Sequence, residues 1–159
     1  MIRVLLVCTG NMCRSPLAEA LLRAEFERRG EDETEVTSAG TGAWDGSAAS
    51  EGAYLVGLEN DLDLSSHRAR LLSRELVGQS DLILTMARHH RGRVEELGGR
   101  GRVHLLGEYA GFQGSEAEVA DPFGADLDVY RRTFNQLSEF VAAVAGRIVE
   151  ERDAQDRGD

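Results

Sequence analysis

One short segment near the start of the chain contains a thiol, a guanidinium and a hydroxyl. Cys8 is followed six positions later by Arg14 and then by Ser15, with Gly10 and Asn11 between them. A cysteine thiolate is a nucleophile, and a turn of backbone N–H groups beside an arginine suits an anion with several oxygens. This spacing predicts a site that binds a phosphate group and attacks it through sulfur.

A free thiol is mostly protonated at neutral pH, so Cys8 needs neighbours that stabilise its thiolate. We expect these to be the backbone N–H groups of the following turn, the amino end of the next helix and Arg14. Gly10 is expected to adopt a positive φ and so permit the tight turn. We expect Ser15 to donate its hydroxyl hydrogen to the sulfur and Asn11 to brace the loop through its side-chain amide.

The segment lies where a strand gives way to a helix. Residues 3–7 form an apolar run rich in Val and Leu, which is typical of a strand covered on both faces. Ser15 and Pro16 offer an N-cap and a first helical residue, and apolar residues at helical spacing continue to Gly30. The sequence therefore predicts a strand, a turn and a helix around the candidate nucleophile.

The rest of the chain alternates in the same way, which indicates an α/β fold. Since alternating strands and helices form right-handed crossovers, we expect a three-layer sandwich: a parallel sheet with helices on both faces. Ligands bind such folds at the carboxyl ends of the strands, where the strand order reverses. Strands are predicted at 35–38, 81–86 and 102–106, helices at 49–58, 73–77, 87–97 and 125–151, and a glycine-rich connection at 107–124.

Length and composition limit the possible classes. A chain of 159 residues fits one domain, here residues 1–151, followed by a charged tail at 152–159 that we expect to be frayed. The net charge of −10 argues against a nucleic-acid-binding surface. The sequence has no apolar run long enough to span a membrane and no signal-peptide pattern, so we expect a cytoplasmic protein that contacts neither membrane nor nucleic acid.

Asp121 is the candidate general acid. A phosphate ester leaves poorly as an oxyanion, so the first step needs a proton donor and the second needs a base for water. One carboxyl can perform both tasks, and Asp121 precedes Pro122 on the loop before the last predicted helix. A turn-capping role for Asp121 fits its spacing equally well.

The adjacent His89 and His90 would point about 100° apart on a helix, so we expect solvated side chains rather than a metal site.

The motif Val-Cys-Thr-Gly-Asn-Met-Cys-Arg-Ser-Pro at 7–16, with Asp121-Pro122 late in the chain, resembles the low-molecular-weight protein tyrosine phosphatases. Segments at 38–44, 66–70 and 81–86 resemble that family in the same order. The resemblance implies a four-stranded parallel sheet, a phosphocysteine intermediate on Cys8 and no need for a metal or cofactor. It also implies that the partner is a phosphorylated protein and that inorganic phosphate is the product.

The resemblance assigns roles residue by residue. It implies that Arg14 binds the phosphate and that Asp121 is the general acid. The phosphate loop and its supporting hydrogen bonds would come from Thr9, Gly10, Asn11, Met12, Cys13, Ser15, Ser38 and His67. In relatives the cysteine that Cys13 matches can form a reversible disulfide with the nucleophile, which would close an inactive state. The alternative for Cys13 is a small packing residue.

Substrate preference is where alternatives stay open. The resemblance implies apolar pocket walls from Met12, Trp44 and Phe123, which suit an aryl phosphate. Phe123 and Gly124 after Asp-Pro resemble the bacterial branch that includes protein arginine phosphatases, whereas Met12 resembles the bulky apolar residue of tyrosine-directed members. We therefore expect phosphotyrosine hydrolysis, with phosphoarginine as the alternative.

Two further alternatives are weaker. An arsenate reductase shares the loop but uses additional cysteines, and no cysteine follows Cys13 here. A catalytically silent phosphate-binding module would need the loop and Arg14 but would have no use for Asp121.

Overall fold

The computed structural model describes residues 1–158, with a sheet of four parallel strands at the centre. Across the sheet the strand order is β2, β1, β3, β4. Strand β1 pairs with both β2 and β3, so it lies in the interior of the sheet. The strands are β1 (Ile2–Cys8), β2 (Thr34–Gly40), β3 (Leu82–Thr85) and β4 (Val103–Leu105).

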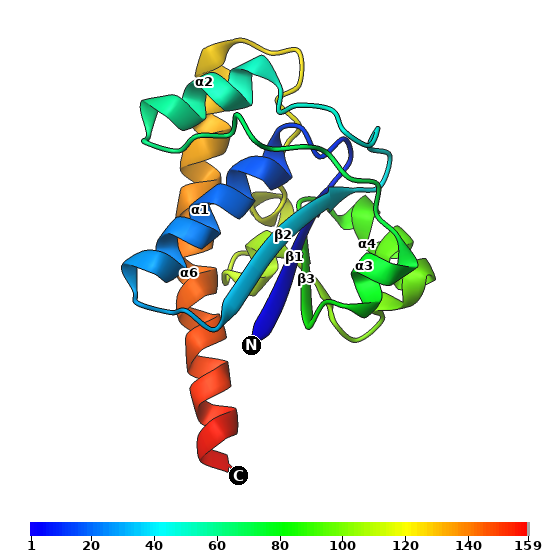
Figure 1. The fold of residues 1–159 in the computed structure, drawn as a ribbon, viewed down its shortest axis with the longest axis vertical. Helices are drawn as coiled ribbons and strands as arrows, with labels where there is room; N and C mark the ends of the chain where they lie inside the picture. The colour runs from blue at the N-terminus through cyan, green and yellow to red at the C-terminus, as the bar shows by residue number, and fades with distance from the viewer. Residues whose placement is uncertain (159) are drawn as a thin grey trace.

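Helices cover both faces of this sheet, so the predicted three-layer α/β sandwich is confirmed. Figure 1 shows α1 and α6 on one side of the strands and α3 and α4 on the other. The α-helices are α1 (Arg14–Arg28), α2 (Glu51–Glu59), α3 (Arg74–Gly78), α4 (Arg88–Val94), α5 (Leu106–Tyr109) and α6 (Leu127–Gly158). A π-helical turn, η1 (Glu95–Gly99), and a 3₁₀ turn, η2 (Gly114–Ala117), complete the set.

Alternate residues of β1 enter two separate cores. Val4 and Leu6 pack with α1 and α6, whereas Leu5 and Val7 pack with side chains of α3 and α4. Each is at most 1% exposed, and burial of such a side chain stabilises the fold by about 1.5–3 kcal/mol relative to exposure. Because both faces are covered, the strand must be apolar throughout, and its register places Cys8 at its carboxyl end.

The strand order reverses beside Cys8. The chain passes from β1 to β2 on one side and later crosses to β3 on the other side of β1. At such a switch point the two crossovers leave on opposite faces, and the carboxyl ends of the central strands line a crevice. The first helix, α1, begins here, so its amino end and the loop before it face that crevice.

The connection predicted at 107–124 contains more regular structure than expected. Strand β4 ends at Leu105, and the next residue already begins α5; the 3₁₀ turn η2 follows at Gly114–Ala117. These turns form because apolar residues of the connection are buried against the core, among them Tyr109 and Ala117. The helix predicted at 87–97 divides into α4 and η1, and helical backbone geometry ends at Gly98, which has a φ of 101°.

The last helix continues beyond its predicted end. The helix was expected to end near residue 151, but α6 extends to Gly158, and residue 159 lies outside the described part of the chain. Fraying of this end stays a prediction. Arg152 Nη1 lies 2.6 Å from Glu31 Oε2, which ties this end of α6 to the segment after α1. An ion pair between residues so distant in sequence produces no local sequence pattern from which the helix end could be predicted.

None of the described helices is long and apolar enough to cross a membrane.

Candidate active site

The loop between β1 and α1 turns sharply at Asn11. This residue has a φ of 55°, whereas Gly10, predicted to supply the positive φ, does not have one. That prediction is wrong because an asparagine tolerates the left-handed region when its short polar side chain makes local hydrogen bonds. The side chain of Asn11 makes such bonds, so the turn is held in place rather than merely allowed.

Asn11 is the centre of a buried hydrogen-bond network. Its Nδ2 donates to Ser15 Oγ at 2.8 Å and to Ser38 Oγ at 2.9 Å, and its Oδ1 accepts from the N–H of Arg70 at 2.9 Å. His67 Nε2 lies 2.7 Å from the Asn11 carbonyl oxygen and must donate, because a carbonyl can only accept. The structure thus brings together four of the residues predicted to form or support the loop: Asn11, Ser15, Ser38 and His67.

Cys8 lies at the base of this loop. Its side chain is 2% exposed, and its Sγ lies 2.9 Å from Ser15 Oγ. Since Ser15 Oγ already accepts a hydrogen from Asn11, its own hydrogen is free to donate to the sulfur. A hydrogen bond to sulfur stabilises the thiolate over the thiol.

Ser15 serves this contact and does not cap α1. The helix begins two residues earlier than predicted, at Arg14, with Cys13 as its N-cap and no side-chain capping bond. Pro16 is the third helical residue rather than the first, and it is tolerated because N–H groups of the first turn have no partner within a helix. The predicted cap is wrong because the Ser15 hydroxyl points to Cys8 and Asn11 instead.

Arg14 is fixed inside the site while one of its donors stays without a partner. It is 3% exposed; its Nη1 donates to the Val119 carbonyl at 2.9 Å, and its Nη2 lies 3.4 Å from Thr9 Oγ1. Its Nε is buried and has no hydrogen-bond partner among residues 1–158. An unpaired buried donor costs about 1–3 kcal/mol, so this atom indicates a place for an acceptor such as a phosphoryl oxygen.

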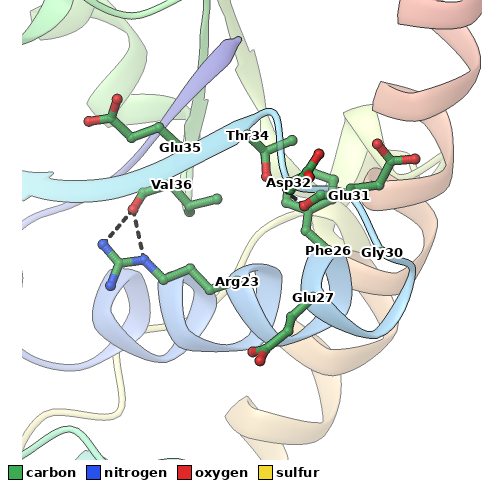
Figure 2. A pocket seen from close by; sticks show the side chains of 9 residues that line it. All are labelled: Arg23, Phe26, Glu27, Gly30, Glu31, Asp32, Thr34, Glu35 and Val36. Carbon is green, nitrogen blue, oxygen red and sulfur yellow. Dashed lines mark hydrogen bonds between the residues drawn. The ribbon is translucent and has the colours of Figure 1, made fainter.

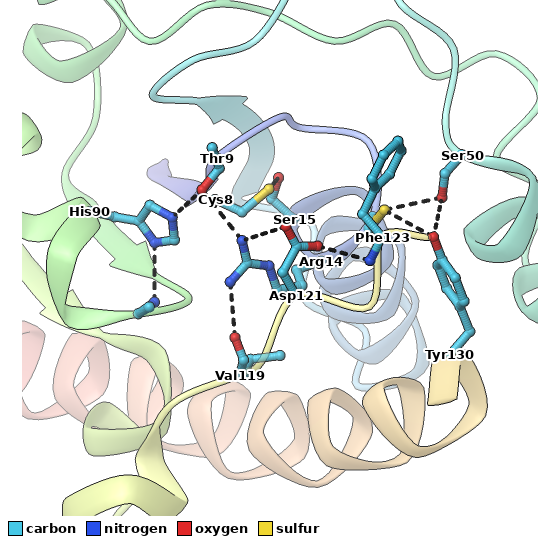
Figure 3. A network of polar contacts seen from close by, with 12 residues as sticks. Cys8, Thr9, Arg14, Ser15, Ser50, His90, Val119, Asp121, Phe123 and Tyr130 are labelled. Carbon is cyan, nitrogen blue, oxygen red and sulfur yellow. Dashed lines mark hydrogen bonds and ion pairs between the residues drawn. The ribbon is translucent and has the colours of Figure 1, made fainter. Parts of the chain in front are cut away.

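Asp121 completes the group from the loop before α6. Its Oδ2 lies 3.7 Å from Arg14 Nη2, and its Oδ1 accepts from the N–H of Phe123 at 3.1 Å. The carboxyl is half-exposed, so water and a substrate can reach it. Figure 3 shows Asp121 over the side of the loop that carries Cys8 and Arg14. The sequence is compatible with either a turn cap or a general acid at Asp121. The structure shows both the turn contact with the Phe123 N–H and the proximity to Arg14.

The pocket around these groups has a volume of about 220 Å³. Met12 and Phe123 line it, as expected for pocket walls. Trp44 does not: it is 83% exposed and lies in the loop after β2, so its predicted place in the wall is wrong. Phe123 is itself 65% exposed and forms the rim. The pocket is lined by Cys8, Thr9, Gly10, Met12, Cys13, Arg14, Asp121 and Phe123.

A larger hollow of about 610 Å³ lies elsewhere, between the end of α1 and the start of β2 (Figure 2). It is at the amino ends of the strands, away from Cys8, and Arg23 crosses it to donate to the Val36 carbonyl. Its other polar side chains are Glu27, Glu31, Asp32, Thr34 and Glu35. No thiol, imidazole or unpaired buried donor lines it, so size alone does not locate the reactive site.

Among residues 1–158 no group of three or more metal-ligating side chains is placed to hold a metal ion.

Cys13 belongs to a second polar cluster that the sequence did not indicate. Its Sγ donates to Ser50 Oγ at 3.1 Å and lies 3.4 Å from Tyr130 OH, and these two hydroxyls are 3.2 Å apart. Burial raises the pKa of the Cys13 thiol, and it raises that of Tyr130 to about 12. Both cysteines are free thiols here, so the disulfide with Cys8 remains a prediction.

His90 is the clearest departure from the sequence-based expectation. It was expected to be solvated, but it is fully buried, and its Nε2 lies 2.9 Å from Thr9 Oγ1. Burial, followed by the nearby His89 and Arg14, lowers the pKa of His90 from 6.5 to about 4. A helix shows one face to the core, and of two neighbouring histidines only one can lie on it. The apolar residues around the pair did not reveal which.

This burial predicts a dependence of stability on pH. The unfolded chain binds a proton at His90 below about pH 6.5 and the folded chain only near pH 4, so stability falls as pH falls through this window. We expect the free energy of unfolding to lose on the order of 2 kcal/mol from this group between pH 7 and pH 4. Urea unfolding at several pH values measures it. His90→Gln cannot be protonated there and should show a smaller loss; equal losses in both proteins would contradict the assignment.

The fold and the loop together define the class: an α/β protein whose candidate site lies between the first strand and the first helix. The sequence model of the low molecular weight phosphotyrosine protein phosphatase family matches residues 3–154. The chain belongs to this family and is therefore a hydrolase.

Individual relatives fall into two groups. The protein-arginine-phosphatase of Bacillus subtilis (strain 168) is 36% identical over 151 residues, which are 94% of this chain and 98% of the relative. The low molecular weight protein-tyrosine-phosphatase PtpB of Staphylococcus haemolyticus (strain JCSC1435) is 38% identical over 136 residues, 85% of this chain and 91% of the relative. A mutant of the YwlE arginine phosphatase with a phosphorylated active-site serine superposes with a TM-score of 0.88 at 34% identity, covering 96% of this chain and 99% of that one.

Proposed function

We propose that this chain hydrolyses phosphotyrosine in proteins through a phosphocysteine intermediate on Cys8. The observation that carries the proposal is the meeting of a buried thiol, a buried guanidinium with an unpaired Nε and a reachable carboxyl in one pocket. These are the nucleophile, the phosphate ligand and the proton donor that a phosphate ester requires.

In the first step the Cys8 thiolate attacks phosphorus and the ester bond to the leaving oxygen breaks. Arg14, through Nε and Nη2, and the loop N–H groups bind the three other oxygens, whose charge grows in the transition state. Asp121, protonated, gives its proton to the leaving phenolate. In the YwlE arginine phosphatase mutant named above, the active-site serine is phosphorylated, which supports a covalent intermediate for this reaction.

In the second step water attacks the phosphocysteine and the S–P bond breaks. Asp121, now ionised, accepts a proton from that water, which yields inorganic phosphate. The sulfur leaves as a thiolate, and Ser15 stabilises it because its hydroxyl hydrogen points to Sγ at an oxygen–sulfur distance of 2.9 Å. The Asn11 amide holds Ser15 in this orientation throughout.

The Asp121→Asn variant tests the general acid. An amide cannot donate this proton, so we expect kcat/KM, which reports the formation of phosphocysteine and not its later hydrolysis, to fall by about 100-fold or more for phenyl phosphate, a poor leaving group. For p-nitrophenyl phosphate, whose phenolate leaves without a proton, the loss should be at most about 10-fold. Asp128→Asn, an exposed aspartate on α6, is the matched control and should behave as wild type. Equal losses for both substrates would remove Asp121 from the role of acid.

Met12 and Phe123 favour an aryl ester, because both line the pocket and a phenyl ring gains from contact with apolar walls. Protein arginine phosphatase is the second candidate, since the B. subtilis relative that bears this name matches nearly the whole chain. A phosphoguanidinium is polar and needs hydrogen-bond partners that the Met12 thioether does not offer.

A comparison of two matched peptides tests this choice. We expect kcat/KM to favour the phosphotyrosine peptide over the phosphoarginine peptide by at least about 10-fold. Met12→Thr replaces the apolar wall by a hydroxyl and should reduce that ratio. Steady-state phosphate release from both peptides measures it. A wild-type preference for phosphoarginine would reverse the order of the two candidates while leaving the phosphatase reaction in place.

A further inference from the structure

His90 is a buried imidazole that the proposed reaction does not use. It is the third residue of α4, and it reaches from that helix to the phosphate loop across 81 positions of sequence. Its Nδ1 accepts the N–H of Ala87, the residue before α4, at 3.1 Å. An imidazole bonded at both nitrogens and fully buried has a single orientation, so its contact with the loop is fixed.

The bond to Ala87 determines which nitrogen carries the hydrogen. Because the backbone N–H donates to Nδ1, that nitrogen has no hydrogen, and the neutral ring carries it on Nε2. The ring is neutral at ordinary pH, since burial and nearby positive charge lower the pKa of His90 to about 4. His90 Nε2 therefore donates to Thr9 Oγ1, 2.9 Å away.

Thr9 connects this histidine to the guanidinium. Its Oγ1 accepts from His90 Nε2 and from Arg14 Nη2, which uses both lone pairs of a hydroxyl oxygen. Figure 3 shows the line of contacts from His90 through Thr9 to Arg14 and on to the Val119 carbonyl. Thr9 is exposed and lines the pocket, so without His90 its side chain would be free to rotate.

We propose that His90 is a positioning residue of the phosphatase reaction: through its hydrogen bond to Thr9 it sets the orientation in which Arg14 presents Nε and Nη2 to the phosphoryl group. This inference rests on the proposed function of the same site. Besides its ion pair with Asp121, Arg14 has two hydrogen-bonded anchors, the Val119 carbonyl and the Thr9 hydroxyl. Loss of one lets the guanidinium turn, and a small misplacement of a charged donor weakens transition-state binding more than ground-state binding.

Two substitutions at position 90 separate the two bonds of the imidazole. In His90→Asn the side-chain oxygen can replace Nδ1 as acceptor for Ala87, but no donor reaches Thr9. In His90→Gln the side-chain amide can replace Nε2 as donor to Thr9. Thr9→Val, at an exposed loop residue, removes this bond and also the bond from Arg14 Nη2, and Thr9→Ser keeps the hydroxyl. His89→Asn alters the exposed neighbour and is the matched control.

We expect kcat for p-nitrophenyl phosphate to fall about 10-fold in His90→Asn and in Thr9→Val, with KM changed by less than about 3-fold. The affinity for vanadate, measured by competition or calorimetry, should fall in parallel. His90→Gln and Thr9→Ser should stay within about 3-fold of wild type, and His89→Asn should be unchanged. The double variant His90→Asn/Thr9→Val should be no slower than Thr9→Val alone, since Thr9→Val already removes the bond that His90→Asn removes.

The inference would be overturned if the double variant lost kcat by the product of the losses in the two single variants. It would also be overturned if His90→Asn kept the kcat and the vanadate affinity of the wild type. An equal loss in His90→Asn and His90→Gln would overturn it as well, because it would show that only the volume of the ring matters. Failure of the proposed function gives a different result: the wild-type protein itself would then release no phosphate from the aryl ester, whatever residue stands at position 90.

Discussion

The Cys8→Ser variant is expected to lose hydrolysis of an aryl phosphate by at least about 10⁴-fold while still binding inorganic phosphate. A serine hydroxyl is far less acidic than a thiol, so it is a much weaker nucleophile and a much poorer leaving group from phosphorus. The N–H groups of the loop and Arg14, which hold the anion, are unaffected by the change. Stopped assays with p-nitrophenyl phosphate measure turnover, and calorimetry with phosphate measures binding.

Cys13→Ser is the matched control for this experiment, since it removes the other thiol of the loop. Cys13 bonds Ser50 and Tyr130 and is buried, so we expect a loss of at most about 10-fold. Turnover by Cys8→Ser at the wild-type rate would end the phosphocysteine mechanism. Loss of phosphate binding in Cys8→Ser would contradict the assignment of the anion to the loop N–H groups and Arg14.

The Arg14→Lys variant is expected to lower kcat by about 1,000-fold. The charge is retained, but a single ammonium cannot bond the Val119 carbonyl and also present two donors to the phosphoryl oxygens. Because the fit of the guanidinium improves as charge moves to those oxygens, kcat should fall more than KM rises. Steady-state kinetics with an aryl phosphate separates the two constants.

Arg91→Lys is the control for the charge-preserving change, because Arg91 is exposed on α4. It should leave both constants within about 2-fold of wild type. A kcat for Arg14→Lys within about 3-fold of wild type would show that position 14 needs only a positive charge, and the bidentate role would be wrong.

The positions of the strands follow closely from the sequence, since two covered faces demand a continuous apolar run. Residues 3–7 and 81–86 were predicted on this basis and contain most of β1 and β3. Boundaries were less accurate where tertiary contacts decide them. Helix α6 continues beyond the end of its apolar pattern, and there Arg152 bonds Glu31, a residue far away in the chain.

The residues of the candidate site likewise fall into those that were predicted from the sequence and those that only tertiary contacts decide. The structure brings Cys8, Arg14 and Asp121 to one pocket, and the Asn11 network holds the loop as expected. Trp44 was misplaced because exposure of a loop side chain depends on which other segments cover it. Ser50, Tyr130 and His90 were not anticipated, since each contacts the loop from an element with no motif of its own.

The amino-acid sequence by itself indicated a strand, a turn and a helix around Cys8, because the apolar run before the loop and the helical spacing after it are local patterns. It also determined the chemical groups available there. Only the tertiary structure decided which of two adjacent histidines is buried against Thr9, how far Asp121 lies from Arg14 and whether Trp44 joins the pocket. The reason is physical: these contacts depend on how β1, α4 and the loop before α6 pack together, and packing between distant segments leaves no periodic signal in either one.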